Sequence, residues 1–130
     1  MKFYIASSFR NIDAVRSVAE KLKSNGFVLT YDWTSGCASS ITELEMIGRN
    51  EKQAVMEADF MIILLPAGKG SHVEMGIALG SGKKVFLYSP DEKVNDLALT
   101  STFYHLSEVC KVIGSIEELV EEVCTQAAFY

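Results

Sequence analysis

Metal-binding and disulfide patterns are missing from this sequence of 130 residues. Its three cysteines, Cys37, Cys110 and Cys124, are odd in number and widely spaced, and no Cys-x-x-Cys motif occurs. This spacing indicates neither a zinc site nor a disulfide framework, so we expect no metal. Cytoplasmic residence is the simplest interpretation of such cysteine usage.

An excess of positive charge is also missing, because 12 Lys and Arg face 17 Asp and Glu and leave a net charge of −5. A general nucleic-acid-binding protein needs a basic face, so this class is excluded. A single phosphorylated small molecule needs only a few local donors and remains compatible with this charge.

Long apolar runs are absent as well, and the first one, Met1–Ala6, meets polar residues at Ser7. It is too short for the core of a signal peptide, and no segment approaches the length of a membrane span. We therefore expect no membrane partner. Apolar residues make up 48% and charged residues 22%, which is typical of a soluble globular protein, and the length predicts one domain over residues 1–130.

Apolar runs of strand length alternate with helical periods along the chain. This alternation predicts an α/β fold, a three-layer sandwich around a five-stranded parallel sheet of the flavodoxin-like or Rossmann-like type, with strand order 2-1-3-4-5. The predicted strands are residues 2–6, 27–31, 59–65, 84–88 and 109–113, and the predicted helices are residues 11–24, 41–58, 71–81 and 115–126.

In this strand order the first and third strands are neighbours, so the loops that follow them face one crevice. These loops, Ser7–Asn11 and Pro66–Glu74, are the two richest polar segments of the chain. The topology alone therefore predicts that the ligand site lies between them.

The glycine-rich segment Pro66-Ala-Gly-Lys-Gly-Ser71 has two interpretations. It is not a Walker A loop, which needs a further glycine where this chain has apolar strand residues such as Leu64. Either its backbone amides and Lys69 bind an anion, or it is a plain strand-to-helix turn that needs glycine for its backbone.

Glu74 also has two interpretations. Ser71-His-Val-Glu74 matches the S-x-x-E capping box, in which the glutamate binds the backbone of the cap residue. Against this, the helix continues with Gly76, Ala78 and Gly80, which suggests a close backbone approach despite the cost in helix stability. A carboxylate near a helix N-terminus also stays ionised, as a nucleophile requires.

The segment that follows the first strand brings hydroxyls and a guanidinium to the crevice. Arg10 could bind a phosphate with two parallel hydrogen bonds, with Ser8 beside it. Its alternative is a solvated arginine at a helix start, where a cation is mildly unfavourable. Tyr4 lies on the strand itself and needs no role beyond a core aromatic.

Three motifs together resemble the nucleoside 2-deoxyribosyltransferase superfamily: Tyr4-Ile-Ala-Ser-Ser-Phe-Arg10, Ala58-Asp59 before an apolar strand, and Gly70-x-x-x-Glu74-x-Gly76-x-Ala78 followed by Gly82-Lys83. Arg10 is similar to the branch that hydrolyses nucleoside 5′-monophosphates, the deoxynucleoside monophosphate N-glycosidases. The resemblance covers the chain from Lys2 to about Tyr88.

The resemblance implies cleavage of an N-glycosidic bond, by hydrolysis or transfer, through a covalent glycosyl-glutamate. Glu74 matches the family's nucleophile, Tyr4 a tyrosine beside it, and Glu51 stands at the position of the family's base-protonating aspartate, one methylene longer. No cofactor is implied, and the expected small-molecule partner is a nucleoside or nucleotide. The residues expected to bind the substrate are Ser8, Arg10, Lys69, Gly70, Ser71 and, from a neighbouring subunit of a homodimer, Ser101 or Thr102.

Two departures from the family pattern keep a second hypothesis open. Besides Glu51, the loop carries Gly68 where relatives usually carry a serine. The alternative function is a non-catalytic nucleotide or nucleotide-sugar binding module on the same fold. The apolar end Ala127-Ala-Phe-Tyr130 indicates either an interface or docking on the protein's own core.

Overall fold

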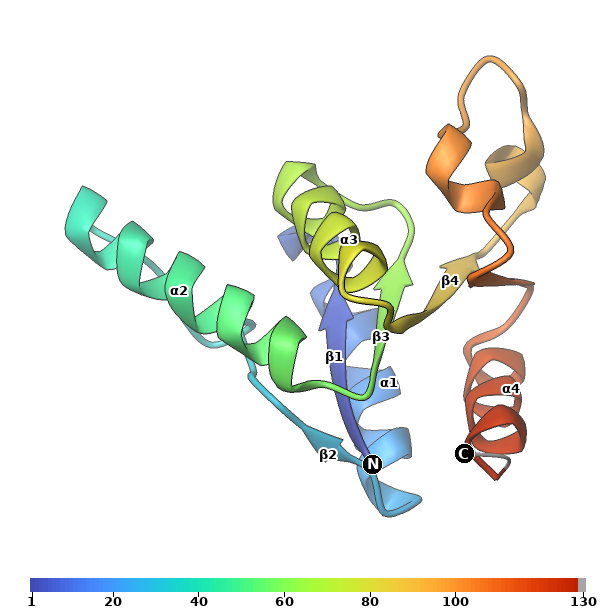
Figure 1. The fold of residues 1–130 in the computed structure, drawn as a ribbon, viewed down its shortest axis with the longest axis horizontal. Helices are drawn as coiled ribbons and strands as arrows, with labels where there is room; N and C mark the ends of the chain where they lie inside the picture. Colours follow the sequence, from blue (N-terminus) through green and yellow to red (C-terminus); the bar gives the residue numbers. More distant parts are fainter. Residues whose placement is uncertain (129–130) are drawn as a thin grey trace.

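Strands and helices alternate along the chain in the computed structural model, which describes residues 1–128 (Figure 1). Phe129 and Tyr130 of the apolar carboxyl end lie outside the described residues. The elements in chain order are β1 (Lys2–Ala6), the 3-10 helix η1 (Phe9–Asn11), α1 (Ile12–Ser24), β2 (Val28–Leu29), α2 (Ile41–Glu57), β3 (Phe60–Leu64), α3 (Lys69–Gly80), β4 (Lys84–Ser89), the 3-10 helices η2 (Glu92–Asn95) and η3 (Thr102–His105), β5 (Val109–Ile113) and α4 (Ile116–Ala127).

The five strands form one parallel sheet in the order β2-β1-β3-β4-β5, which confirms the predicted order. β1 and β3 are neighbours, in a register that runs from Phe3 opposite Phe60 to Ala6 opposite Ile63. All five residues of β3 are buried, as its unbroken apolar run predicts for a central strand. Helices α1 and α4 pack together on one face of the sheet, and α2 and α3 on the other (Figure 1).

The edge strand β2 is shorter than its apolar pattern predicts, with Val28–Leu29 instead of residues 27–31. The last backbone bond toward β1 is donated by the Thr30 N–H to the Phe3 carbonyl at 2.9 Å. Beyond it the chain leaves the sheet, and the indole N–H of Trp33 donates to the Ile5 carbonyl at 2.7 Å. A side chain thus supplies the donor that a longer strand would supply from its backbone.

The Gly82-Lys83 pair connects α3 to β4, and Lys83 also contacts the C-terminal end of α2. Gly82 has a φ of +74°, a conformation that favours glycine. The Lys83 ammonium donates to the carbonyls of Met56 and Ala58, at 2.8 and 2.7 Å. Because carbonyls at a helix C-terminus lack helical donors and carry partial negative charge, this contact stabilises the end of α2. It also fixes α2 beside β3 and β4.

Helix α2 is the longest helix, with 17 residues, and its first half projects away from the sheet (Figure 1). Its apolar side chains there are exposed, among them Ile41 at 81%, Met46 at 59% and Leu44 at 54%. No helix within residues 1–128, α2 included, has the length and apolar character needed to cross a membrane.

Candidate active site

The loops after β1 and β3 meet at the carboxyl edge of the sheet, as the strand order predicts. The Ser7 hydroxyl donates to the Leu64 carbonyl at 2.8 Å, and the Ser71 hydroxyl donates to the Ser7 carbonyl at 2.8 Å. Asn11 donates from its side-chain amide to the Ser7 hydroxyl at 3.2 Å. These bonds tie the end of β1 to the first turn of α3.

Glu74 lies inside α3 and is not part of a cap. The helix begins at Lys69 with Gly68 as its N-cap, two residues earlier than predicted, so Ser71 and Glu74 occupy its interior. The capping-box interpretation is therefore wrong, because the Ser71 side chain bonds to Ser7 instead of to the helix backbone. Glu74 is 7% exposed and accepts a short hydrogen bond from the Tyr4 hydroxyl.

Glu51 reaches the same hydroxyl from α2, with 3.3 Å between the Tyr4 oxygen and Glu51 Oε2. Tyr4 is fully buried on β1, so its ring fixes the position of the phenol between the two carboxyl groups. Three elements that are distant in the sequence thus bring two carboxyl groups to one hydroxyl. The arrangement supplies a pair of carboxyl groups capable of nucleophilic and acid–base chemistry.

Burial is the largest influence on the proton affinity of this cluster. Burial first, and then the hydrogen bond and charge of Glu51, raise the pKa of Glu74 to about 8, while the hydrogen bond from Tyr4 acts in the opposite direction. Burial and the two nearby carboxylates raise the pKa of Tyr4 far above its ordinary value. Tyr4 therefore stays a hydrogen-bond donor, and the carboxyl pair holds a proton near neutral pH.

The remaining residues predicted to bind the substrate form the polar rim of the crevice. Ser8 is half-buried, and its Cβ would lie 3.9 Å from a Cβ placed on Gly68. Arg10 is exposed in η1, and Lys69 and Gly70 are exposed in the first turn of α3. The first N–H groups of α3 lack helical acceptors, so this rim can bind an anion.

Ser101 is not brought to the carboxyl pair. Its hydroxyl accepts from the Phe103 N–H at 3.3 Å, and it lines a groove of about 550 Å³ along α3. The lining residues of that groove are His72, Met75, Gly76, Leu79, Gly80, Ser101, Phe103 and Leu106, without Glu51 or Glu74. A Cβ on Gly76 or Gly80 would meet no atom within 4 Å, so the close backbone approach suggested by these glycines does not occur within the described chain.

The structure shows a contact between His72 and Tyr104 that the sequence does not predict. The His72 ring lies 2.7 Å from the Gly68 carbonyl through Nδ1 and 2.6 Å from the Tyr104 hydroxyl through Nε2. The contact fixes η3 against the first turn of α3. No local pattern signals it, because 32 residues separate the two side chains.

The sequence matches a family model. That model describes the nucleoside 2-deoxyribosyltransferases and covers residues 3–119 of this chain. The chain belongs to this family. Membership confirms the resemblance and supports an enzyme that cleaves or transfers at an N-glycosidic bond.

Solved structures extend the likeness to the fold. The CMP N-glycosidase BcmB of Clostridium botulinum has a TM-score of 0.63 at 15% identity, over 95% of this chain and 99% of that one. A de novo designed Rossmann 2x3 protein has a TM-score of 0.51 at 14% identity, over 98% of this chain and 88% of that one. No curated protein matches the sequence. At these identities the two structures show a shared Rossmann-like fold.

Because the carboxyl group of Glu74 is buried, we expect the free energy of unfolding of the protein to depend on pH. In the unfolded chain it titrates near 4.5 and in the folded protein near 8, so between these values only the folded state retains the proton. Stability from this group is therefore complete below about pH 4.5 and falls as pH rises toward 8. We expect Glu74→Gln, which needs no ionisation, to raise the melting temperature by roughly 5 °C at pH 8.5.

Thermal unfolding followed by circular dichroism from pH 4.5 to 9 checks this expectation. The advantage of Glu74→Gln should shrink steadily toward the acid end of the range. Glu20→Gln, at an exposed position on α1, controls for the general effect of removing one negative charge. An advantage of Glu74→Gln that is the same at every pH would contradict the assigned burial effect.

Proposed function

We propose that this protein hydrolyses the N-glycosidic bond of a nucleoside 5′-monophosphate through a covalent intermediate on Glu74. The observation that carries the proposal is the buried Glu74 carboxyl, which shares the Tyr4 hydroxyl with Glu51. Family membership supports N-glycosidic chemistry, and the likeness to a CMP N-glycosidase favours a nucleotide substrate. Residues 1–130 would act as one nucleoside 2-deoxyribosyltransferase-like domain in the cytoplasm.

In the proposed first step, a carboxylate oxygen of Glu74 attacks C1′ of the sugar and forms an ester. The bond from C1′ to the base nitrogen breaks, its electron pair goes to the base, and Glu51 donates the proton that neutralises it. Because burial raises the pKa of Glu74 to about 8, the attack also requires Glu74 to give up its proton first, and the proposed acceptor of that proton is Glu51. Tyr4 donates to Glu74 and orients the attacking oxygen.

In the second step, water attacks C1′ and breaks the ester, and Glu51 accepts the proton of that water. The products are a sugar 5-phosphate and the free base, and both carboxyl groups return to their starting state. If a second base replaced water, the same intermediate would give transfer instead of hydrolysis. Retaining glycosidases use two carboxyl groups in this way.

The phosphate is proposed to bind at the rim formed by η1 and the start of α3. Ser8 and Arg10 lie at the start of η1, and the first turn of α3 contains Lys69, Gly70 and Ser71. A helix N-terminus with a nearby guanidinium and ammonium favours a doubly charged phosphate over a neutral hydroxyl.

The alternative, a non-catalytic nucleotide or nucleotide-sugar binding module, would be favoured by a Glu74 that caps its own helix and by a crevice without a second carboxylate. Glu74 instead points to the Tyr4 hydroxyl, and Glu51 lies within reach of that hydroxyl. The buried Glu74 carboxyl is costly to maintain and supplies nothing to simple binding. The geometry therefore supports catalysis.

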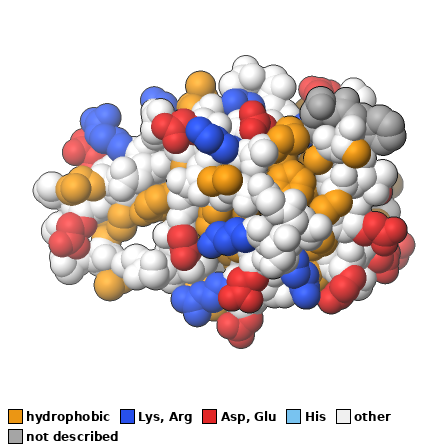
Figure 2. All heavy atoms as spheres, turned by 90° about the horizontal axis from the view of Figure 1, so that it is seen from below, with side chains coloured by type: hydrophobic (Ala, Val, Ile, Leu, Met, Phe, Trp, Pro, Cys, Tyr) orange, Lys and Arg blue, Asp and Glu red, His pale blue; other side chains and the backbone are white. Residues whose placement is uncertain are grey.

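The protein is further proposed to act as a homodimer that joins the projecting α2 and the groove along α3. Figure 2 shows apolar side chains among charged ones on the projecting end at the left of that view. Val73 on α3 and Phe103 on η3 are also exposed, at 65% and 60%. A second copy would cover these surfaces and could bring its Ser101 or Thr102 toward the first copy's rim.

Replacement of Glu74 tests the nucleophile. We expect Glu74→Ala to lower base release at least about 1,000-fold, because the proposed mechanism assigns the glycosyl ester to Glu74. Free base would be measured by chromatography after incubation with a panel of nucleosides and nucleoside 5′-monophosphates, including CMP. Undiminished base release by a folded Glu74→Ala protein would rule out the assignment.

Replacement of Arg10 tests the phosphate site separately. Loss of a bidentate charge-assisted contact should raise KM for nucleoside 5′-monophosphates about 10- to 100-fold. Unphosphorylated nucleosides are the internal control, and their kcat/KM should stay within about twofold. Equal losses for Arg10→Ala on both substrate classes would exclude a phosphate contact.

The homodimer is checked by light scattering during gel filtration, with activity measured on the same fractions. We expect a mass of twice the 14.3 kDa chain and expect Leu44→Glu, on the exposed face of α2, to yield monomers. A charge placed in an apolar interface must lose its hydration, which strongly opposes association. A monomeric and fully active wild-type protein would contradict the proposal.

A further inference from the structure

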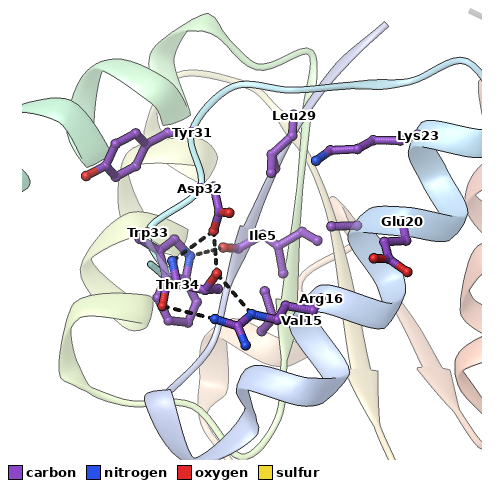
Figure 3. Close-up of a pocket in the computed structure, with 11 residues that line it drawn as sticks. Ile5, Val15, Arg16, Glu20, Lys23, Leu29, Tyr31, Asp32, Trp33 and Thr34 are labelled. Atoms are coloured by element: carbon purple, nitrogen blue, oxygen red, sulfur yellow. Dashed lines mark hydrogen bonds between the residues drawn. The ribbon is translucent and has the colours of Figure 1, made fainter. Parts of the chain in front are cut away.

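A groove that the proposed chemistry does not use lies between α1 and the edge strand β2 (Figure 3). This α1 groove has a volume of about 220 Å³, and its apolar lining comes from Ile5, Val15, Ala19 and Leu29. Side chains alternate along β1, so Ile5 faces the groove while Tyr4 faces the carboxyl pair on the other side of the sheet. The α1 groove is therefore separate from the candidate active site.

The local sequence keeps the α1 groove open and its walls fixed. The chain leaves the sheet after Thr30, so β2 does not extend over the groove. Ala19 contributes only a methyl group, where Val15 one turn earlier contributes a larger side chain. Trp33 forms the opposite wall, and its indole N–H donates to the Ile5 carbonyl at 2.7 Å. Because this wall is already held in place, a ligand loses little of its binding energy to ordering the protein.

The edge of the α1 groove carries two cations and two carboxylates, namely Arg16, Glu20, Lys23 and Asp32. Their charges sum to zero, but they are separated in space. Figure 3 shows the side chains of Arg16 and Lys23 extending from α1 toward the loop that carries Asp32. Neither cation forms an ion pair with any residue that the structure describes. Positive charge on one side of the groove thus faces a carboxylate on the other.

Asp32 is held as an ionised acceptor. Its Oδ1 accepts from the Thr34 N–H at 2.9 Å and from the Thr34 hydroxyl at 2.6 Å (Figure 3). The bond from that hydroxyl has the largest effect and lowers the pKa of Asp32, and the charges of Lys23 and Arg16 act in the same direction. Both bonds end on Oδ1, so Oδ2 is left to accept from a ligand.

We propose that the α1 groove binds a small zwitterion with an apolar body, the chemistry of an apolar α-amino acid. Its carboxylate lies against Lys23 and Arg16, its ammonium against Asp32, and its side chain on the apolar lining. A simple anion would be repelled by Asp32, and a simple cation by Lys23 and Arg16, so the edge favours a ligand that carries both signs. Pockets for drug-sized ligands hold roughly 300–1,000 Å³, and the smaller α1 groove suits a molecule of amino-acid size.

The fluorescence of Trp33 tests the proposal directly, because Trp33 is the only tryptophan of the chain and lines the groove. Its emission would be followed during titration with free leucine, and calorimetry would give the Kd. The matched probes are 4-methylpentanoate, which is leucine without its ammonium group, and 3-methylbutylamine, which is leucine without its carboxylate. We expect each probe to bind at least about 10-fold more weakly than leucine, because each leaves one charged side without a partner.

Charge variants assign the two ends of the ligand. Lys23→Gln should weaken leucine about 3- to 30-fold without weakening 3-methylbutylamine. Asp32→Asn retains the oxygen that Thr34 bonds, and it should weaken leucine to a similar extent without weakening 4-methylpentanoate. Lys21→Gln is the matched control, because Lys21 lies on the same helix outside the groove. Ala19→Leu fills the groove and should weaken leucine at least about 10-fold.

Three outcomes would overturn the proposal. The first is no change in Trp33 emission and no heat of binding with about 10 mM leucine. The second is equal affinity for leucine and either of the matched probes, which would indicate a plain apolar groove. The third is an equal effect of Lys21→Gln and Lys23→Gln on leucine binding. The melting temperature of each variant shows whether the fold is retained.

The proposal and the proposed function fail independently. Because the α1 groove and the carboxyl pair lie on opposite faces of the sheet, Glu74→Gln should bind leucine within about twofold of the wild-type protein. A protein that releases base but does not bind leucine would retain the Glu74 chemistry and lose the groove ligand. A protein that binds leucine but releases no base would show the reverse.

Discussion

The hydrogen bond from the buried Tyr4 hydroxyl to Glu74 is the contact on which the geometry of the candidate site depends. It joins the middle of β1 to the second turn of α3, and Glu51 of α2 approaches the same oxygen. A carboxyl group with 7% exposure is costly when it ionises without partners. The protein offsets part of this cost with the Tyr4 donor, and it retains a proton on the carboxyl pair near neutral pH.

The parallel order of the strands makes this contact possible. Because β1 and β3 are neighbours, the carboxyl end of each strand lies beside the other, and the serine bonds between Ser7, Leu64 and Ser71 fix the spacing. The Lys83 ammonium then holds the end of α2, so that Glu51 approaches from a fixed helix. Contacts far from the carboxyl pair therefore determine its geometry.

Much of the fold could be predicted because the signals are local or follow from topology. The apolar runs predict the bounds of four of the strands to within one or two residues. The strand order predicts that the loops after β1 and β3 lie side by side, as the hydrogen bond between Ser71 and Ser7 shows. The sequence pattern predicts a later start for α3 than the structure has, because Gly68 caps the helix without a side-chain signal and the S-x-x-E pattern of Ser71 and Glu74 suggests a later cap. Here a tertiary contact, the bond from Tyr4, outweighed a local pattern.

Other parts of the site have no local signal at all. β2 is short because the Ile5 carbonyl accepts a hydrogen bond from the Trp33 side chain instead of from a backbone amide of a longer strand. The loop that carries Trp33 is bonded to α1 through Arg16, and this packing holds the Trp33 side chain in place. The alternation of a strand then gives β1 two roles. Tyr4 points to the carboxyl pair on the face of α2 and α3, while Ile5 lines a groove on the face of α1 and anchors Trp33 through its carbonyl. One short strand thus positions both the carboxyl pair and Trp33, so a change in how β2 pairs with β1 would disturb the anchor of Trp33 and the position of Glu74 together.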